Sequence, residues 1–170
     1  MWTTMPSPIG DLRLVEAGGA LTAIHFAPFG PMAVTPMAAT QENMPQENMP
    51  DVLTEAIAQL RTYFDGELRE FDVPMAPEGT EFQRRVWREL RTIPYGTTAS
   101  YGEIATRMDL STGAARAVGL ANAHNPIPII VPCHRVIGAD GSLTGYAGGL
   151  ARKRYLLGLE AGEQPLALGI

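Results

Sequence analysis

The spacing of apolar residues changes character along this 170-residue chain. Residues 11–27 hold two apolar runs split by Ala-Gly-Gly-Ala, a pattern typical of a β-hairpin. Residues 51–64 then carry apolar side chains at helical spacing, and Asp65-Gly66 marks the helix end. The apolar positions at helical spacing are Val52, Ala56, Leu60 and Phe64. A hairpin followed by an amphipathic helix predicts a small α/β unit in the first part of the chain.

The stretch between the hairpin and this helix, about residues 28–50, follows neither periodicity. It contains five prolines and a direct repeat, QENMP-QENMP. A segment of this composition does not support a packed helix or strand. We therefore expect a mobile loop there, and the sequence assigns it no role.

From Thr80 onward the pattern is mostly helical, and two helix starts are clearly marked. Thr80 with Gln83, and Ser100 with Glu103, have the spacing of a capping box, in which each side chain bonds the backbone of the other residue. The second box places Tyr101 at the first position of its helix.

The helix that begins at Tyr101 is followed by a turn containing Gly113 and then by AARAVGLANAH, residues 114–124. Helix, short turn and helix is the helix-turn-helix pattern. The second helix is rich in Ala and Gly and carries one long cation, Arg116, near its start. Such a surface can approach another backbone closely. A tightly packed core helix would have the same composition, and the pattern alone does not separate the two.

Composition describes an ordinary globular protein, with 45% hydrophobic and 18% charged residues. The N-terminal residues have no signal-peptide pattern, and no run approaches the roughly 20 apolar residues of a membrane span. We therefore expect a cytoplasmic protein that does not associate with membranes.

The net charge of −5 is divided unevenly along the chain. Residues 1–79 hold 3 Arg/Lys and 11 Asp/Glu, giving −8; residues 80–160 hold 10 and 6, giving +4; Glu163 adds −1. An acidic part followed by a basic part predicts two units with different roles. Any phosphate binding belongs to the second unit.

Cys133 is the only cysteine of the chain and lies within IIVPCHRVIG. A single cysteine forms no internal disulfide, and without a CxxC or HxxxH pair we expect no metal site. An isolated cysteine is most often a buried structural residue. Here, however, His134 and Arg135 follow directly, and their charges would favour the thiolate and lower the pKa of the thiol.

Three prolines in the preceding NPIPIIVP predict an extended, rigid path up to Cys133. Neighbouring side chains of an extended chain point to opposite sides. We therefore expect a water molecule, rather than direct contact, to link Cys133 to His134. A histidine used as a base needs an orienting carboxylate, and Glu160, at the end of a helix predicted over about 149–160, is the candidate.

Taken together, these residues resemble the O6-alkylguanine-DNA alkyltransferase family, the methylated-DNA–protein-cysteine methyltransferases. The likeness rests on NPIPIIV before PCHRV, on GYAGGLARKRYLLGLE after it, and on the order of helix-turn-helix, Cys-His pair and distal glutamate. It implies an α+β two-domain fold. A small RNase H-like α/β domain would span residues 1–78, and a helical DNA-binding and alkyl-transfer domain with a winged helix-turn-helix would span residues 79–170. It implies no cofactor and no metal.

The resemblance also implies an activity, which is direct-reversal repair of alkylated DNA. Cys133 would take the alkyl group of O6-alkylguanine, and of O4-alkylthymine, and would not be regenerated. His134 would act as its base through a water molecule, and Glu160 would orient His134. Tyr101 would donate a proton to N3 of the departing guanine.

The implied partner is double-stranded DNA containing alkylated guanine, bound through the minor groove by a monomer, with cooperative binding left open. The nucleotide would be flipped out of the duplex, and Arg116 would fill the gap. The implied DNA-binding residues are Arg116, Tyr101, Ala114, Ala115, Ala117 and Gly119. The implied substrate pocket comprises Val136, Tyr146, Ala147 and Asn125. Ala147 stands where some relatives carry serine, so it can contribute its backbone only. Asn125 would tie the recognition helix to the active-site turn.

Two other functions remain open on the sequence. An alkyltransferase-like protein binds alkylated DNA without repairing it, and Cys133 argues against this class because those proteins lack the cysteine. A cysteine hydrolase or acyl transferase would use Cys133 and His134, and it would leave the helix-turn-helix without a role.

Overall fold

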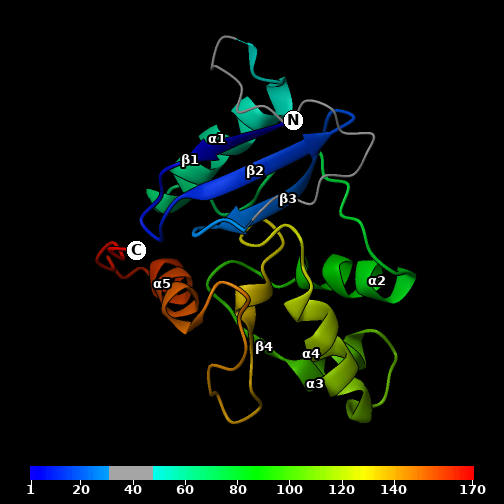
Figure 1. Ribbon diagram of the computed structural model, residues 1–170. Coiled ribbons are helices and arrows are strands. Elements are labelled where there is room, and N and C mark those ends of the chain that lie inside the picture. The colour runs from blue at the N-terminus through cyan, green and yellow to red at the C-terminus, as the bar shows by residue number, and fades with distance from the viewer. Residues whose placement is uncertain (31–47) are drawn as a thin grey trace. The chain divides into compact units, whose positions relative to one another are not determined.

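A computed structural model describes residues 1–30 and 48–170 of the chain (Figure 1). The chain forms two compact units. The first comprises Met1–Ala76 together with the last four residues, Ala167–Ile170, and the second comprises Pro77–Leu166. The sequence-predicted loop over about 28–50 falls largely on residues 31–47, which lie outside the described residues.

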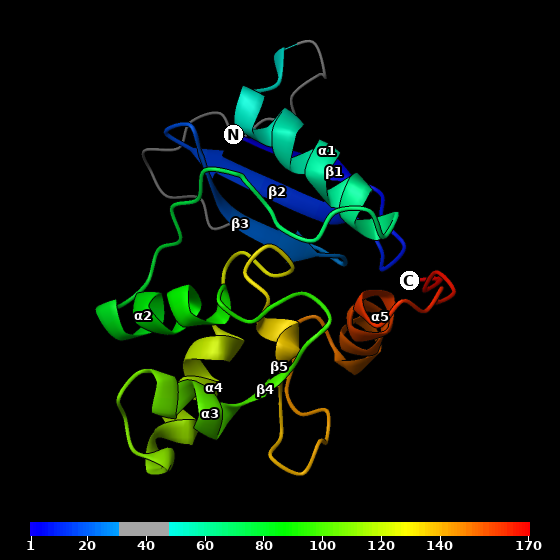
Figure 2. The same ribbon diagram turned by 180° about the vertical axis from the view of Figure 1, so that it is seen from behind.

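The first unit is built on a three-stranded antiparallel sheet of β1 (Trp2–Met5), β2 (Leu12–Ala17) and β3 (Ala20–Phe26), in the order β1-β2-β3. The predicted hairpin is confirmed as β2 and β3. Its two-residue turn is Gly18-Gly19, with φ of 62° and 79°, a conformation that glycine adopts without steric cost. One helix, α1 (Asp51–Phe64), lies across one face of this sheet in both views (Figures 1 and 2).

The predicted helix over residues 51–64 is confirmed, and its buried face is broader than the four positions in the pattern. Phe64 was expected on that face, but it is only partly buried, whereas Tyr63 is fully buried. The ring of Tyr63 also packs against Phe64 and Phe71, with centroids 5.5 and 5.3 Å away. The buried residues of α1 are Val52, Leu53, Ala56, Ile57, Leu60 and Tyr63.

The second unit contains most of the helices. They are α2 (Glu81–Leu90), α3 (Tyr101–Arg107), α4 (Ala115–Ala123) and α5 (Leu150–Glu160), with short 3-10 turns η2 (Thr112–Ala114) and η3 (Cys133–Arg135). Two short strands, β4 (Ala99–Ser100) and β5 (Val136–Ile137), pair in parallel. This pairing brings the start of α3 beside the residues that follow Cys133. Among the described residues, no helix is long and apolar enough to cross a membrane.

Both predicted capping boxes are present. Thr80 and Gln83 bond each other's backbone at the start of α2, and Ser100 and Glu103 do so at the start of α3. Tyr101 is therefore the first residue of α3, as the sequence predicts. These caps satisfy backbone N–H groups that a helix start would otherwise leave unpaired.

Helices α3 and α4 lie side by side and form the helix-turn-helix (Figure 2). Helix α2 packs against α4, and the indole nitrogen of its Trp87 donates to the Ala121 carbonyl at 2.9 Å. The inward residues of α4 are Val118, Ala121 and Asn122. The opposite face is exposed and includes Arg116 and Ala117. The helix is thus half-buried, not the wholly packed core helix that its composition also allowed.

Candidate active site

The chain reaches Cys133 through a compact turn, not through the extended path predicted from the prolines. The amide of Val131 donates to the Ile127 carbonyl at 3.0 Å, and the amide of Cys133 donates to the Val131 carbonyl at 2.8 Å. Cys133 itself begins the 3-10 turn η3. The extended prediction was wrong because these backbone hydrogen bonds fold the segment back on itself, and the prolines occur within the turns.

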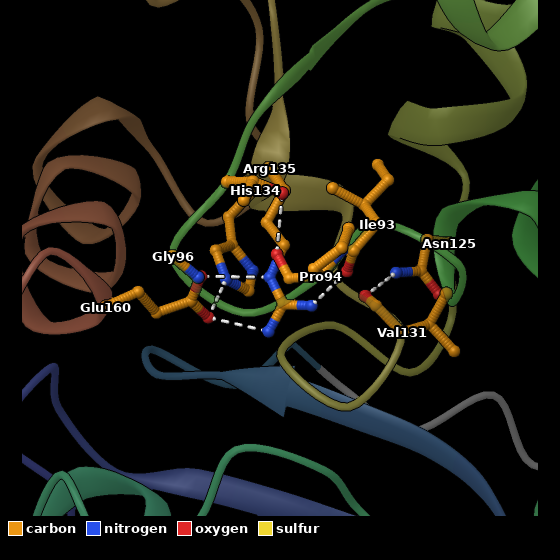
Figure 3. Close-up of polar contacts among 9 residues, drawn as sticks. Ile93, Pro94, Gly96, Asn125, Val131, His134, Arg135 and Glu160 are labelled. Atoms are coloured by element: carbon orange, nitrogen blue, oxygen red, sulfur yellow. Dashed lines mark hydrogen bonds and ion pairs between the residues drawn. The ribbon is translucent and has the colours of Figure 1, made fainter.

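Two asparagines fix this turn to the end of α4. Asn125, two residues beyond the helix, donates to the Val131 carbonyl at 2.8 Å (Figure 3) and accepts from the Ile127 amide at 3.0 Å. Asn122, within α4, donates to the carbonyl of Cys133 at 3.4 Å. The helix-turn-helix is therefore connected directly to the backbone that carries the thiol.

The Cys133 side chain is buried, with 4% of the residue exposed. Burial raises the pKa of the Cys133 thiol to about 11, and this effect outweighs the opposing hydrogen bond from Asn125 and the positive charge of Lys153. The lowered pKa predicted from the adjacent His134 and Arg135 is therefore wrong. Burial disfavours the charged thiolate, and the side chains of His134 and Arg135 are directed towards Glu160.

Those neighbours converge on Glu160, the last residue of α5 (Figure 3). Nε2 of His134 lies 2.8 Å from Oε1 of Glu160. Arg135 donates to both carboxylate oxygens at 2.9 Å and to the Ile93 carbonyl at 2.7 Å. The amide of Gly96 also donates to Oε2 of Glu160, in a longer hydrogen bond of 3.4 Å. The carboxylate is thus fully engaged in a buried cluster.

The charges of this cluster follow from its contacts. Burial alone would raise the pKa of Glu160, but the hydrogen bonds and charges of His134 and Arg135 hold it down to about 2. Burial lowers the pKa of His134, against the opposing effect of Glu160. A neutral His134 therefore donates through Nε2, and its other ring nitrogen, Nδ1, has no hydrogen-bond partner among the described residues. Nδ1 is free to accept a proton.

Lys153 is a buried cation of the site that was not predicted from the sequence. Its ammonium donates to the carbonyls of Val136, at 2.6 Å, and Thr144, at 2.9 Å. Burial lowers the pKa of Lys153, and its charge in turn favours the thiolate of Cys133. A signal for it exists in the sequence. Lys153 precedes Glu160 by seven residues on one helix, so an inward Glu160 predicts an inward Lys153.

Tyr101 stands at the edge of this site. Its hydroxyl lies 3.5 Å from the Thr144 carbonyl and 3.3 Å from the Thr144 hydroxyl, so it contacts the same residue as Lys153. Of the predicted pocket residues, Val136 is fully buried and Ala147 is exposed. The pKa of the Tyr146 phenol is raised by burial and by the neighbouring charge of Cys133, which places that ring near the thiol.

A cleft of about 690 Å³ opens beside Tyr101. Its walls come from both ends of α3, from the first residue of α4 and from the loop after β5, and include Tyr101, Glu103, Arg107, Ala115 and Ala139. Cys133 is not among the residues that line it. The cleft therefore reaches the tyrosine edge of the site and does not expose the thiol.

The predicted DNA-binding residues occupy the start of α4. Arg116 is exposed and makes no hydrogen bond or ion pair within the described part of the chain. Ala117 is exposed, and Ala114 and Ala115 are partly exposed. Gly119 points the other way, since a Cβ there would lie 3.5 Å from the Tyr101 ring. The glycine allows α4 and Tyr101 to approach each other closely.

A helix-turn-helix bonded to a turn that carries a thiol, a histidine and its carboxylate partner joins a DNA-binding element to a nucleophile and a base, as expected of an enzyme that acts on DNA. The family model for the 6-O-methylguanine DNA methyltransferase DNA-binding domain matches residues 81–162, and the model for the ribonuclease-like domain of the same family matches residues 1–77. The chain belongs to this family. The predicted α+β two-domain fold class is confirmed by both matches.

Related proteins align with this chain over nearly its whole length. A protein of Mycobacterium bovis named methylated-DNA–protein-cysteine methyltransferase is 52% identical over 167 residues, covering 98% of this chain and 96% of its own. The crystal structure of Mycobacterium tuberculosis OGT in complex with DNA has a TM-score of 0.81 at 51% identity, covering 96% of this chain and 94% of that one. An O6-methylguanine DNA methyltransferase of Methanococcus jannaschii has a TM-score of 0.64 at 28% identity, with 95% and 93% covered.

Proposed function

We propose that this chain repairs alkylated DNA directly, as a methylated-DNA–protein-cysteine methyltransferase that transfers the alkyl group of O6-alkylguanine to Sγ of Cys133. The observation that carries the proposal is the only thiol of the chain beside a buried His134–Glu160 pair, on a turn bonded to a helix-turn-helix. The names of the relatives and the family match support the same activity.

The transfer is a displacement at the alkyl carbon. Nδ1 of His134 takes the thiol proton through a water molecule, and the resulting thiolate attacks the carbon attached to O6. The S–C bond forms as the C–O bond breaks, and the electron pair remains on the guanine. Glu160 stabilises the imidazolium, and the charge of Lys153 stabilises the thiolate while it exists.

The departing guanine needs a proton as negative charge develops on its ring. Tyr101 is the proposed donor, directed at N3, and its hydroxyl is held at the site edge by Thr144. The product is a neutral guanine in the DNA and a thioether on Cys133. A thioether is not cleaved by the groups present, so each molecule reacts once.

The base must leave the duplex to reach a buried thiol. We assign its exit to the face of α4 that carries Arg116, which would occupy the vacated space, with Ala114, Ala115 and Ala117 allowing close approach in the minor groove. Gly119 acts indirectly, by letting Tyr101 pack against α4. Minor-groove binding suits a repair protein because that groove distinguishes sequences poorly.

The flipped base would enter a pocket bounded by Val136, Tyr146 and the backbone of Ala147, with Asn125 holding the turn beneath it. O4-alkylthymine is a second proposed substrate, because its alkyl group is also carried by an exocyclic ring oxygen. We further propose that the protein acts in the cytoplasm and as a monomer, since one chain supplies every residue of the proposed site.

Mass spectrometry after incubation with duplex DNA containing O6-methylguanine tests the activity. One added methyl group on the peptide containing Cys133, with the DNA guanine restored, supports it. Binding without a mass change would indicate lesion recognition without repair, and repeated turnover would indicate hydrolysis. Cys133→Ala should abolish transfer and retain DNA affinity. Loss of both in a folded Cys133→Ala variant would make Cys133 a structural residue.

A further inference from the structure

Leu120 is an exposed apolar side chain on the recognition helix. Of this residue, 63% is accessible to solvent. The other exposed large apolar residues of the described chain lie at the two ends or at the first residue of α5, and are Met1, Leu150, Leu166 and Ile170. A single exposed leucine is ordinary on a protein surface. The position of this one is what distinguishes it.

Leu120 follows Arg116 by four residues, so the two side chains lie on the same face of α4, one helical turn apart. Ala117 is exposed on the same side. Because its side chain is small, the side chain of Leu120 protrudes from this part of the helix surface. The helix cannot rotate to bury it. Trp87 holds the carbonyl of Ala121 at 2.9 Å, and Val118 and Asn122 are buried on the inner side.

Helix α4 extends beyond Leu120 to Ala123. Nδ1 of His124 lies 2.7 Å from the Leu120 carbonyl, and the His124 amide also donates to that carbonyl, at 3.2 Å. These bonds satisfy the carbonyl of Leu120 in the last turn and leave only the isobutyl group to face outward. The exposed face thus presents a cation at one end and an aliphatic group at the other.

We propose that Leu120 is a DNA-contacting residue that packs against the deoxyribose rings lining the minor groove, and thereby seats α4 beside the flipped nucleotide. This proposal rests on the proposed function, in which Arg116 marks the DNA face. Four residues of helix rise about 6 Å, close to the length of two nucleotides along a strand at roughly 3.4 Å each. The contact therefore falls within about two nucleotides of the lesion.

The sugar edge is the part of the groove that suits an aliphatic side chain. Deoxyribose presents C–H groups, whereas the phosphates need cations and the base edges need hydrogen-bonding groups. A leucine at this position would increase the affinity for DNA by removing apolar surface from water. It would not distinguish one base sequence from another. It also displaces no counterions, in contrast to Arg116 near a phosphate, and this difference makes the two contacts separable by experiment.

The test measures affinity for duplex DNA containing O6-methylguanine at several salt concentrations, with every variant built on Cys133→Ala to prevent transfer. Leu120→Ala should weaken binding about tenfold, the loss expected for most of a buried leucine side chain. The slope of log affinity against log salt should be unchanged. Leu120→Met should retain most of the affinity, and Leu120→Gln should lose as much as Leu120→Ala.

Two controls accompany these variants. Leu166→Ala makes the same chemical change at a residue 89% exposed outside α4 and should leave affinity unchanged. Arg116→Ala should reduce the salt slope by about one. With Cys133 restored, Leu120→Ala should react with free O6-benzylguanine at the parent rate, since that base needs no DNA contact.

Parent-like affinity in Leu120→Ala overturns the proposal, as does a loss shared by Leu166→Ala. A loss accompanied by a changed salt slope also overturns it, because the variant would then have displaced ionic contacts. So does slower reaction with free O6-benzylguanine, which would mean that Leu120 supports the pocket or the fold. Failure of the parent chain to bind the duplex or to take its methyl group refutes the proposed function instead.

Discussion

His134 and Glu160 are joined by a buried hydrogen bond of 2.8 Å between Nε2 and Oε1. Both side chains are almost completely buried. Arg135 donates a hydrogen bond of 2.9 Å to each oxygen of the same carboxylate. The carboxylate therefore has two roles, and both depend on its negative charge. It can stabilise a protonated His134 during the reaction, and it neutralises a permanently charged guanidinium in the interior.

Glu160→Gln should consequently reduce both the transfer rate and the stability. The amide leaves the Arg135 charge unpaired in the interior, which costs about 3–5 kcal/mol. Denaturant unfolding and single-turnover rates, measured where the variant is still folded, check the two effects. Glu163→Gln, an exposed glutamate three residues later, is the matched control and should stay within about 0.5 kcal/mol of the parent. A variant as stable as the parent would contradict the buried ion pair.

Acid unfolding provides a second test of the same carboxylate. The pKa of Glu160 is lowered to about 2 from an ordinary value of 4.5. The folded state therefore binds this proton less readily than the unfolded chain does, so stability is lost as pH falls from about 4.5 towards about 2. Comparing stability against pH for the parent and Glu160→Gln should show a step in the parent that the variant lacks. Parallel curves would mean that Glu160 does not carry the lowered pKa.

The transfer rate should depend on pH through His134. A neutral ring is needed to accept the thiol proton, and burial lowers the pKa of His134 below its ordinary 6.5. The rate with free O6-benzylguanine should therefore be level near neutral pH and should decline only below about pH 6.5. His124→Gln removes an exposed histidine and should leave this profile unchanged. A decline that begins above pH 7 would require a different base.

Lys153 should matter for the thiol more than any other cation of α5. Burial raises the pKa of Cys133 to about 11, and the charge of Lys153 limits that rise. Lys153→Met should raise the thiol pKa further and slow alkyl transfer by about tenfold or more, one pKa unit being a factor of ten in thiolate. Because Cys133 is the only cysteine, its rate of alkylation by iodoacetamide against pH reports the thiol pKa directly.

Arg154→Met is the control for this variant, since Arg154 is the exposed neighbour of Lys153 on α5. It should change neither the thiol pKa nor the transfer rate. A Lys153→Met protein with the parent thiol titration would show that the ammonium serves only to hold the carbonyls of Val136 and Thr144. A parent titration midpoint near 9 would show that burial does not control the thiol.

The features that the sequence predicted well depend on neighbouring residues. The capping boxes at Thr80 and Ser100 fix two helix starts because the bonded residues are three apart. Gly18-Gly19 fixes the hairpin turn because few other residues adopt positive φ there. The fold class followed from resemblance, since PCHRV and its flanking segments are specific to one family.

The errors concern properties that only tertiary structure sets. The turn before Cys133 depends on a bond from Asn125 to Val131, which proline spacing does not reveal. The pKa of the Cys133 thiol depends on burial, which the sequence does not show. The sequence shows which residues are adjacent to Cys133, but not where their side chains point. Arg135 was expected to favour the thiolate, but its guanidinium pairs with Glu160, 25 residues away. A cation next to a cysteine in sequence is therefore a weak guide to the charge around the thiol.

Arg116 is the residue whose proposed role depends most on DNA. It is exposed and makes no hydrogen bond or ion pair within the described residues, so no structural role in the folded chain accounts for it. Flipping a nucleotide costs a few kcal/mol, and each 1.4 kcal/mol is about tenfold in rate. If Arg116 offsets most of that cost, Arg116→Ala should slow repair of duplex DNA by about ten- to a thousandfold.

The free base separates this role from a role in the pocket. O6-benzylguanine needs no flipping, so Arg116→Ala should react with it at nearly the parent rate. Tyr101→Phe should slow both reactions, because proton donation to the departing guanine is needed in either case. Single-turnover rates of each variant on duplex and free base provide the comparison. If Arg116→Ala slows the free base as much as the duplex, the arginine supports the pocket or the fold, and it does not fill the space of a flipped nucleotide.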